Sequence, residues 1–481
     1  MRNLSILCLL AVMVSSCTKN IQNLNINTKA AVSVPATALF LAGEKNLSDN
    51  YTTTSIGVMP FRVFSQTWTE TTYTTEARYI LSAYNAPDNL WAAMYSSILN
   101  NLTDAKAAFP TTVKDPGTLR NDLIITDILE VYAYDILVVT YGNIPYSQAE
   151  SRTIPYPKYD DAKTVYLDLL TRLDTCIAGL SAATTSASMG AADQVYKGNI
   201  AKWKKFAATL KLKMAMLLAD TDPSTAGKKV QEAVATGVFT ANTDNAQVTY
   251  QSSPTGNTNP IWQAVINSGR HDFCPGGLLV TTMNNWNDPR LPLYWTKATD
   301  GTYKGGVAGA SNSAPLLSTF SAQWTAATYP SDLLDYAETE FLLAEAVERG
   351  FLTGGNTAEQ YYDAGVTASI TFWGGSAGDA AAYLAQPAVA YTTAAGDYKQ
   401  KIGYQKWIAE VNRGWDAWTD IRRLGQPNID AVSPPIGAIT TMPKRFYYPL
   451  KEQTANPANW SAAAKTINGG DVVTSKLFWM P

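Results

Sequence analysis

Two polar stretches of the chain combine aromatic side chains with amide and charged groups. One runs over residues 64–85 and the other over residues 262–324. A flat aromatic ring can stack against the C–H face of a sugar, while amides, carboxylates or Arg bond its hydroxyls. The pattern therefore predicts carbohydrate contacts. The candidates are Trp68, Tyr73, Tyr84, Trp286, Tyr303 and Trp324, with Trp68 the first choice.

These aromatics lie in long segments that lack a helical pattern, over residues 48–90, 240–330 and 425–481. Loops of this length in a folded domain are usually functional. The alternative is that any one of these rings packs beneath its own loop and touches no ligand. Aromatic residues make up 11% of the chain and charged residues 16%, so there are enough aromatics for some to contact a ligand and others to pack beneath loops.

Catalytic patterns are weak. Residues 374–378 match the G-x-S-x-G pattern of serine hydrolases, but His271, the one histidine, lies upstream of them. A single histidine also excludes a multi-histidine metal site. A glycoside hydrolase needs two carboxylates. Glu338 and Glu345 share one helix face, but acids on a helix surface are common and do not by themselves indicate catalysis. We expect no catalytic residue, no bound metal and no cofactor, and hence no enzyme.

Composition narrows the class further. The chain has 481 residues, with 37 Lys+Arg against 40 Asp+Glu and a net charge of −3. A protein surface that binds nucleic acid needs concentrated positive charge. The near-zero net charge therefore excludes a nucleic-acid-binding protein. With 46% hydrophobic residues the chain can bury a large core.

The first residues resemble a bacterial lipoprotein signal. Arg2 precedes a short apolar run, and Val14-Ser15-Ser16-Cys17 is similar to a lipobox. We expect residues 1–16 to be a signal peptide, Cys17 to be lipidated and residues 17–35 to be an extended leader. A plain secretory signal is the alternative. Residues 36–481 would form the folded domain. One disulfide between Cys176 and Cys274 is possible, although Cys176 lies on an apolar helical stripe and reads as a small buried hydrophobe.

Apolar residues recur at helical spacing along much of the remaining chain. These stripes predict helices over residues 121–142, 161–180, 200–220, 331–351, 356–375 and 405–425. They also place four tryptophans in the core, namely Trp203, Trp407, Trp415 and Trp418. Two helices joined by a Gly-rich turn and carrying small residues are typical of helix-pair repeats. The predicted fold is mainly all-α: a tetratricopeptide-like scaffold with an irregular lobe over about residues 240–330.

Five phrases in a fixed order carry a family resemblance. They are YGNIPYSQA from Tyr141, NDPRLPLYW from Asn287, AETEFLLAEA from Ala337, GWDAWTDIRRLGQP from Gly414 and PKRFYYPLKEQTANPANW from Pro443. Together with the lipobox they resemble the SusD/RagB family of outer-membrane lipoproteins, in its SusD-like branch.

The resemblance implies the same helical scaffold and a role in nutrient uptake. It implies a lipid-anchored protein on the outward face of the outer membrane that captures oligosaccharide or peptide. The implied partner is a SusC-like TonB-dependent transporter barrel. Family members exposed at the cell surface often carry acidic residues directly after the lipidated cysteine. Here Thr18-Lys19-Asn20 follows Cys17 instead, so the outward placement rests on the resemblance alone. A structural or adhesive surface lipoprotein is the alternative from another class, and a glycoside hydrolase is a third.

Overall fold

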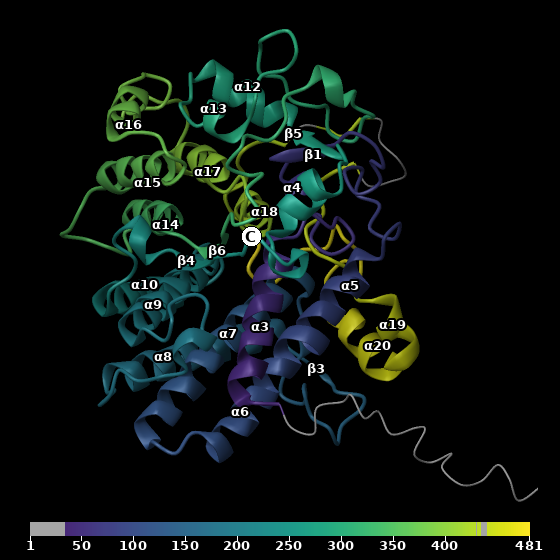
Figure 1. The fold of residues 1–481 in the computed structure, drawn as a ribbon, viewed down its shortest axis with the longest axis vertical. Coiled ribbons are helices and arrows are strands. Elements are labelled where there is room, and N and C mark those ends of the chain that lie inside the picture. The colour runs from purple at the N-terminus through teal and green to yellow at the C-terminus, as the bar shows by residue number, and fades with distance from the viewer. Residues whose placement is uncertain (1–33, 430, 434–439) are drawn as a thin grey trace, which may run out of the picture. The chain divides into compact units, whose positions relative to one another are not determined.

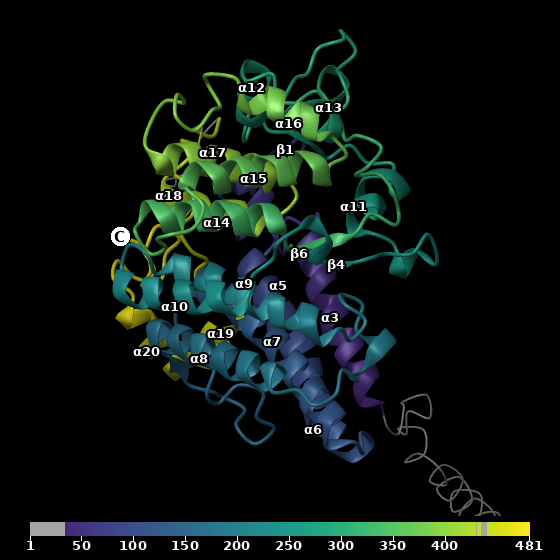
Figure 2. The same ribbon diagram turned by 90° about the vertical axis from the view of Figure 1, so that its left-hand side faces the viewer.

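Helices α3 and α6 to α10 form a layered scaffold in the computed structural model, which describes residues 34–429, 431–433 and 440–481. The predicted signal peptide and Cys17 lie outside the described residues. Successive helices pack against one another along one side of the molecule (Figures 1 and 2). The bounds are α3 (Ala36–Thr52), α6 (Asn100–Thr112), α7 (Pro116–Tyr141), α8 (Ala162–Ser181), α9 (Ile200–Leu217) and α10 (Pro223–Thr236). The mainly helical fold is confirmed.

Local sequence sets where these helices begin. Asp161 accepts the backbone N–H of Thr164 at 2.9 Å ahead of α8, and Asn199 accepts that of Lys202 at 3.1 Å ahead of α9. Such caps satisfy donors that a helix start leaves free. Trp203 of α9 is fully buried, as its stripe predicts. Cys176 is buried in α8, and neither it nor Cys274 forms a disulfide.

A second set of helices stacks on the first: α14 (Tyr336–Glu348), α15 (Ala358–Phe372), α16 (Ala377–Leu384), α17 (Tyr398–Ala409) and α18 (Gly414–Leu424). Gly365 lets α14 and α15 approach closely, because a Cβ there would lie 2.9 Å from the Phe341 ring. Ser376 caps α16 through Asp379, so the G-x-S-x-G match is a helix start.

Two predicted helix spans are wrong in their bounds. Residues 331–334 form strand β6, and α14 begins only after the cap Asp335. Residues 405–425 form two helices instead of one, because the chain turns between α17 and α18. At this turn Gly414 passes so close to Arg62 that a Cβ would lie 2.5 Å from its backbone nitrogen.

The loop-rich lobe contains short elements only, and it occupies the upper part of Figure 1. Its elements are α11 (Pro260–Trp262), η5 (Gln263–Asn267), β5 (Phe273–Pro275), α12 (Gly277–Asn285), α13 (Leu291–Tyr294) and η6 (Ala314–Leu316). Strand β1 (Trp68–Glu70) pairs with β5 in antiparallel register, Trp68 opposite Pro275 and Glu70 opposite Phe273. This ladder joins the early loop to the lobe.

The other short elements complete the chain. Strand β2 (Ile144–Pro145) pairs with β3 (Tyr159–Asp160), and β4 (Ala246–Val248) pairs with β6 (Ser331–Leu334). The short helices are α4 (Phe61–Phe64), α5 (Ala86–Ala92), η1 (Ala93–Leu99), η2 (Gly190–Ala192), η3 (Asn242–Asp244), η4 (Thr255–Asn257), α19 (Leu450–Ala455) and α20 (Pro457–Thr466).

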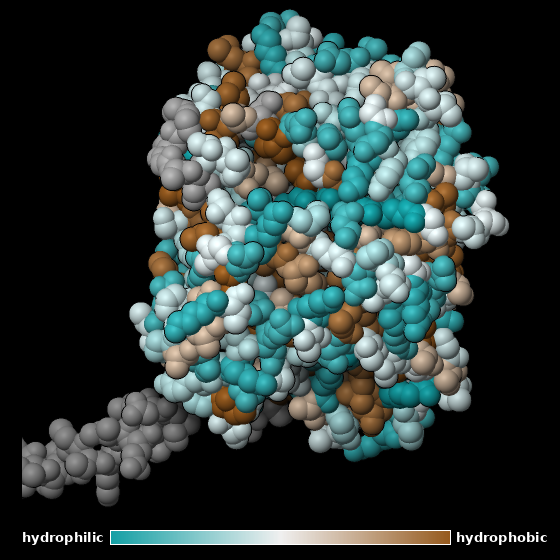
Figure 3. Space-filling model, turned by 180° about the vertical axis from the view of Figure 1, so that it is seen from behind, coloured by the Kyte–Doolittle hydropathy of each residue, from teal (hydrophilic) through white to brown (hydrophobic). Residues whose placement is uncertain are grey.

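The lobe has an aromatic interior. Trp68, Trp295, Trp324, Trp373 and Trp407 are all buried there. On the rear face, apolar side chains are interspersed with polar ones (Figure 3). Among the described residues, no helix is long and apolar enough to span a membrane.

Candidate ligand-binding site

A cavity of about 430 Å³ opens beside the β1–β5 ladder. Its walls come from residues 54–57, from the loop after β1, from the start of α5 and from the segment that leads into β5. The side chains that matter most are Tyr73, Tyr84, Asn89, Arg270, Asp272 and Phe273. A volume of this size falls within the range of small-molecule sites, about 300–1,000 Å³.

The ladder brings these walls together. Immediately after β1, the backbone N–H of Thr71 donates to the carbonyl oxygen of Asp272 at 2.8 Å, which extends the strand pairing by one step. The loop that follows therefore starts beside the segment that carries Arg270. Tyr73 then takes the left-handed conformation, with φ of 58°, and its ring points outward with 61% of its area exposed.

Tyr73 and Arg270 form one surface. The guanidinium carbon of Arg270 lies 5.7 Å from the centre of the Tyr73 ring, within the range of a cation–π contact. Its Nε atom bonds Asp272 Oδ2 at 2.5 Å. The carboxylate thus holds the guanidinium in place beside the ring. An aromatic face, a cation and an anion are presented side by side.

Tyr84 forms the other aromatic wall, with 44% of its area exposed. Its backbone is fixed by Asn89, whose Nδ2 donates to the carbonyl oxygens of Tyr84 and Gly57, each at 2.8 Å. Gly57 allows this approach, because a Cβ there would lie 3.1 Å from the Cβ of Tyr84. Both rings are therefore held on ordered backbone.

A carboxyl group in the wall has an unusual charge state. Burial raises the pKa of Glu70 to about 8, although the N–H of Ala77 donates to it at 3.0 Å and opposes the shift. Burial likewise raises the pKa of the neighbouring Glu76 to about 7. At neutral pH the protonated form of Glu70 is favoured, and a neutral carboxyl can donate a hydrogen bond as well as accept one.

Comparison with known proteins now identifies the family. Residues 28–449 match the model of a family described as starch-binding and associating with the outer membrane. The chain belongs to the SusD-like family. The resemblance predicted from the five phrases is confirmed. A search of curated proteins finds no match.

Solved structures of SusD-like proteins share the fold. A chitin-binding protein is 27% identical with a TM-score of 0.80, over 93% of this chain and 100% of that one. A chitin-binding SusD homologue from Flavobacterium johnsoniae is 26% identical with a TM-score of 0.79, over 92% and 98%. A SusD-like protein from Bacteroides thetaiotaomicron is 27% identical with a TM-score of 0.77, over 93% and 99%.

The structure of this SusD-like chain divides the six predicted contacts. Tyr73 and Tyr84 line the cavity together. Trp286 is half-buried and lines a different cavity. Tyr303 is half-buried, its ring 5.7 Å from Lys297 Nζ, and it lines neither of these two cavities.

Trp68 and Trp324 need correction. They expose 1% and 0% of their area, and their ring centres lie 5.4 Å apart in the aromatic interior. An indole with both faces packed cannot stack on a ligand, so we remove both from the candidate contacts. The polar segment around Trp68 favours an exposed ring, but the strand partner Pro275 and the rings of Phe320 and Trp324 that bury the indole come from distant parts of the chain.

Sequence reasoning did not single out the polar groups of the cavity, Asn89, Arg270 and Asp272. Arg270-His271-Asp272 is a polar triplet directly before an apolar strand, and such a triplet at a strand end is the signal that could have indicated them. The pairing with β1, which places it next to Tyr73, has no local signature.

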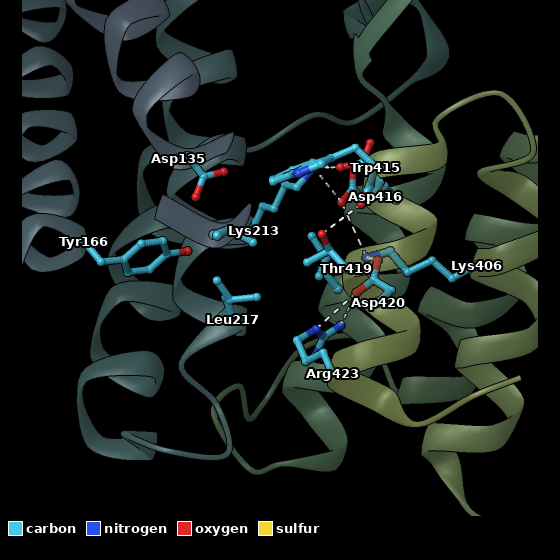
Figure 4. A pocket seen from close by; sticks show the side chains of 13 residues that line it. Asp135, Tyr166, Lys213, Leu217, Lys406, Trp415, Asp416, Thr419, Asp420 and Arg423 are labelled. Carbon is cyan, nitrogen blue, oxygen red and sulfur yellow. Dashed lines mark hydrogen bonds and ion pairs between the residues drawn. The ribbon is translucent and has the colours of Figure 1, made fainter. Parts of the chain in front are cut away.

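The acids considered for glycoside hydrolysis are placed differently from expectation. Glu338 and Glu345 are not on the helix surface, since they expose 1% and 0% of their area. Glu338 lines a cavity of about 20 Å³, whose other walls are a mixture of charged and uncharged side chains (Figure 4). That volume holds about one water molecule and no sugar ring. Within the described residues, this pair therefore has no substrate space.

One group of acids has the spacing of a metal site. Glu338, Glu410 and Asp420 each offer a carboxylate oxygen within 4.8 Å of the others. The ammonium of Lys406 lies 2.5 Å from Asp420 and 3.4 Å from Glu338. Arg413 also pairs with Glu338 and Arg423 with Asp420, so protein cations already surround these acids, which argues for an internal ion network.

Proposed function

We propose that the chain captures oligosaccharide in the cavity between Tyr73 and Tyr84 and delivers it to a TonB-dependent outer-membrane transporter of the SusC type. The observation that carries the proposal is that two exposed rings line one cavity, with Arg270, Asp272 and Asn89 beside them. Rings bind the C–H face of a sugar and the polar groups bind its hydroxyls. No bond is broken in this role.

The comparisons support a glycan over the peptide that the sequence resemblance also allows. The family description names starch, and two of the similar structures are described as chitin-binding. Maltoheptaose and chitohexaose are therefore the first probes. Both are neutral chains whose rings have apolar faces, which suits stacking on two tyrosines.

Isothermal titration of the full chain in detergent with each probe tests the capture. Tyr73→Ala should weaken the binding of the preferred probe about tenfold, which corresponds to about 1.4 kcal/mol. Tyr156→Ala is the matched control, because Tyr156 also exposes 61% of its area but does not line this cavity. Equal affinity of wild type and Tyr73→Ala would contradict the site. Release of reducing sugar over time would contradict a purely binding role.

The membrane arrangement is part of the same proposal. Cys17 would carry the lipid and hold the domain on the outward face of the outer membrane. Cys17→Ala should release the chain from the membrane fraction and remove labelling by radioactive palmitate. Affinity purification of the tagged wild-type chain from outer membranes should recover a TonB-dependent barrel. A membrane-bound chain that repeatedly recovers no barrel would contradict the delivery step.

A further inference from the structure

A second cavity, of about 270 Å³, lies between α12, α15, α17 and the segment over residues 385–397. It shares no lining residue with the first. The aromatic walls of this cavity are formed by Trp286, Tyr362 and Tyr404. Alanines of the segment over residues 385–397 form another wall. The polar groups of its lining are Thr282, Asn285, Gln400 and Lys401.

An ion pair and hydrogen bonds next to Trp286 and Tyr404 support the corner that these two rings form in the cavity. Trp286 ends α12, and its ring centre lies 5.4 Å from that of Tyr404 on α17, with the planes tilted by 58°. Two residues further, Asp288 pairs with the buried Arg290 at 2.6 Å. Arg290 also donates to Gln405 at 2.7 Å, next to Tyr404 on α17.

Arg290 reaches α15 as well, since its Nη1 donates to Ser369 Oγ at 3.1 Å. The Asp-Pro-Arg turn, expected to be structural, therefore ties the end of α12 to two other helices. The consequence for the cavity is that Trp286 and Tyr404 keep a fixed relative position. A fixed platform costs little entropy when a ligand binds.

The opposite wall is also fixed. The hydroxyl of Tyr362 donates to the carbonyl oxygen of Val389 at 2.8 Å. Lys401 Nζ donates to the carbonyl oxygen of Tyr391 at 2.7 Å. These two bonds attach the segment over residues 385–397 to α15 and α17. The cavity is therefore bounded by anchored structure on both sides.

The lining has the chemistry of a sugar site. Ten of the 13 tryptophans are buried, whereas Trp286 keeps part of its indole exposed to this cavity. The side-chain amides of Asn285 and Gln400 make no hydrogen bond to any described residue, so both can bond hydroxyls. No carboxylate lines the cavity. An aromatic corner with two available amides fits a neutral carbohydrate.

We propose that this cavity is a second carbohydrate-binding site, which takes one terminal sugar unit of a glycan. The size supports a single unit, because about 270 Å³ lies just below the range of about 300–1,000 Å³ for larger ligands. The site goes beyond the proposed function and does not depend on the Tyr73 cavity. Two sites on one chain would raise the retention of a long glycan through effective concentration.

Fluorine NMR of the full chain labelled with 5-fluorotryptophan tests the site, with maltose and chitobiose as probes. The Trp286 signal is assigned from its loss in Trp286→Phe. We expect at least one disaccharide at millimolar concentration to shift this signal, also in a Tyr73→Ala/Tyr84→Ala background. Gln400→Ala should raise the midpoint of that titration about fivefold, the effect of one neutral hydrogen bond. The Trp460 signal, from a half-buried indole on α20, is the control and should not move.

The outcomes separate the two sites. A Trp286 signal that moves with neither disaccharide overturns the second site, whatever the Tyr73 cavity binds. Loss of its shift in the Tyr73→Ala/Tyr84→Ala background also overturns an independent site. A shift that persists there, in a chain whose long-glycan binding ignores Tyr73→Ala, supports this site and contradicts the first.

Discussion

Two interior regions of the molecule are held together by opposite means. Where α9, α14, α17 and α18 meet, charged side chains pair inside the protein. Arg413 bonds Asp335 and Asp416, each at 2.8 Å, and also pairs with Glu338. Inside the lobe, tryptophans pack on one another, and the indole nitrogens of Trp68, Trp295 and Trp324 have no hydrogen-bond partner among the described residues.

The difference bears on specificity. Ion pairs have defined partners and geometry, so the charged region sets how α14 meets α17 and α18. Aromatic packing depends mainly on volume and tolerates similar shapes. The charged region should therefore tolerate fewer substitutions than the aromatic region. Both candidate sugar sites are built against the aromatic region, through Phe273 in one case and Trp286 in the other.

Removal of the central cation should have the largest effect on stability. Arg413→Met leaves Asp335, Glu338 and Asp416 buried without their main partner, and we expect a loss of about 3–5 kcal/mol in the free energy of unfolding. Urea denaturation followed by circular dichroism measures it. Arg152→Met is the control, because Arg152 pairs with Asp104 while 78% exposed, and such pairs contribute about 0–1 kcal/mol. Equal losses in the two variants would contradict the distinction.

A buried acid at the edge of the charged region should make stability depend on pH. Burial raises the pKa of Asp135 to about 7, partly opposed by Lys213, while the unfolded value is about 3.9. Between these values the folded state holds a proton that the unfolded state has lost, so this group destabilises the fold as pH rises. Relative to wild type, the free energy of unfolding of Asp135→Asn should therefore rise by at most about 1.4 kcal/mol per pH unit between pH 4 and 7.

Denaturation of Asp135→Asn and wild type at pH 4.5, 6 and 7.5 measures this gain. Asp115→Asn gives the opposite sign, because hydrogen bonds from Thr118 lower the pKa of Asp115. The stability contributed by Asp115 is present above its unfolded pKa and is lost as pH falls through the folded value. A difference between Asp135→Asn and wild type that does not change with pH would contradict a proton held at Asp135.

The aromatic region should respond less than the charged one. In Trp324→Phe the ring loses volume, but a buried N–H without a partner disappears with it. The two effects partly cancel, and we expect a loss of about 1 kcal/mol. Thermal unfolding by calorimetry checks the value. A loss as large as that of Arg413→Met would remove the proposed difference between the two regions.

The sequence predicted what local chemistry determines. The helix over 161–180 was recoverable because an Asp cap precedes a clean apolar stripe, and Trp203 followed from its stripe. The burial of Glu338 was not recoverable, since its partner Arg413 lies 75 residues away and no local pattern announces it. The burial of Trp68 in strand β1 depends in the same way on distant partners, whereas Tyr73, five residues later in the loop after β1, keeps an exposed ring.

Tyr73 offers the smallest effect on stability and the sharpest contrast with Trp68. Its φ of 58° costs a non-glycine residue about 1–2 kcal/mol, and its exposed ring offers little packing in return. Tyr73→Gly should relieve that strain at an entropy cost of about 0.5–1 kcal/mol, for a net stabilisation of about 0.5–1 kcal/mol.

The same variant should lose about tenfold in glycan affinity, as expected for Tyr73→Ala. Tyr156→Gly is the control: Tyr156 has a negative φ, so glycine brings the entropy cost without the relief. Chemical denaturation and glycan titration of both variants give the comparison. A gain in stability with a loss of binding would show that the strained conformation serves the ligand. Lower stability in Tyr73→Gly would contradict the strain at this position, because it would mean that packing of the ring outweighs the relief of the backbone.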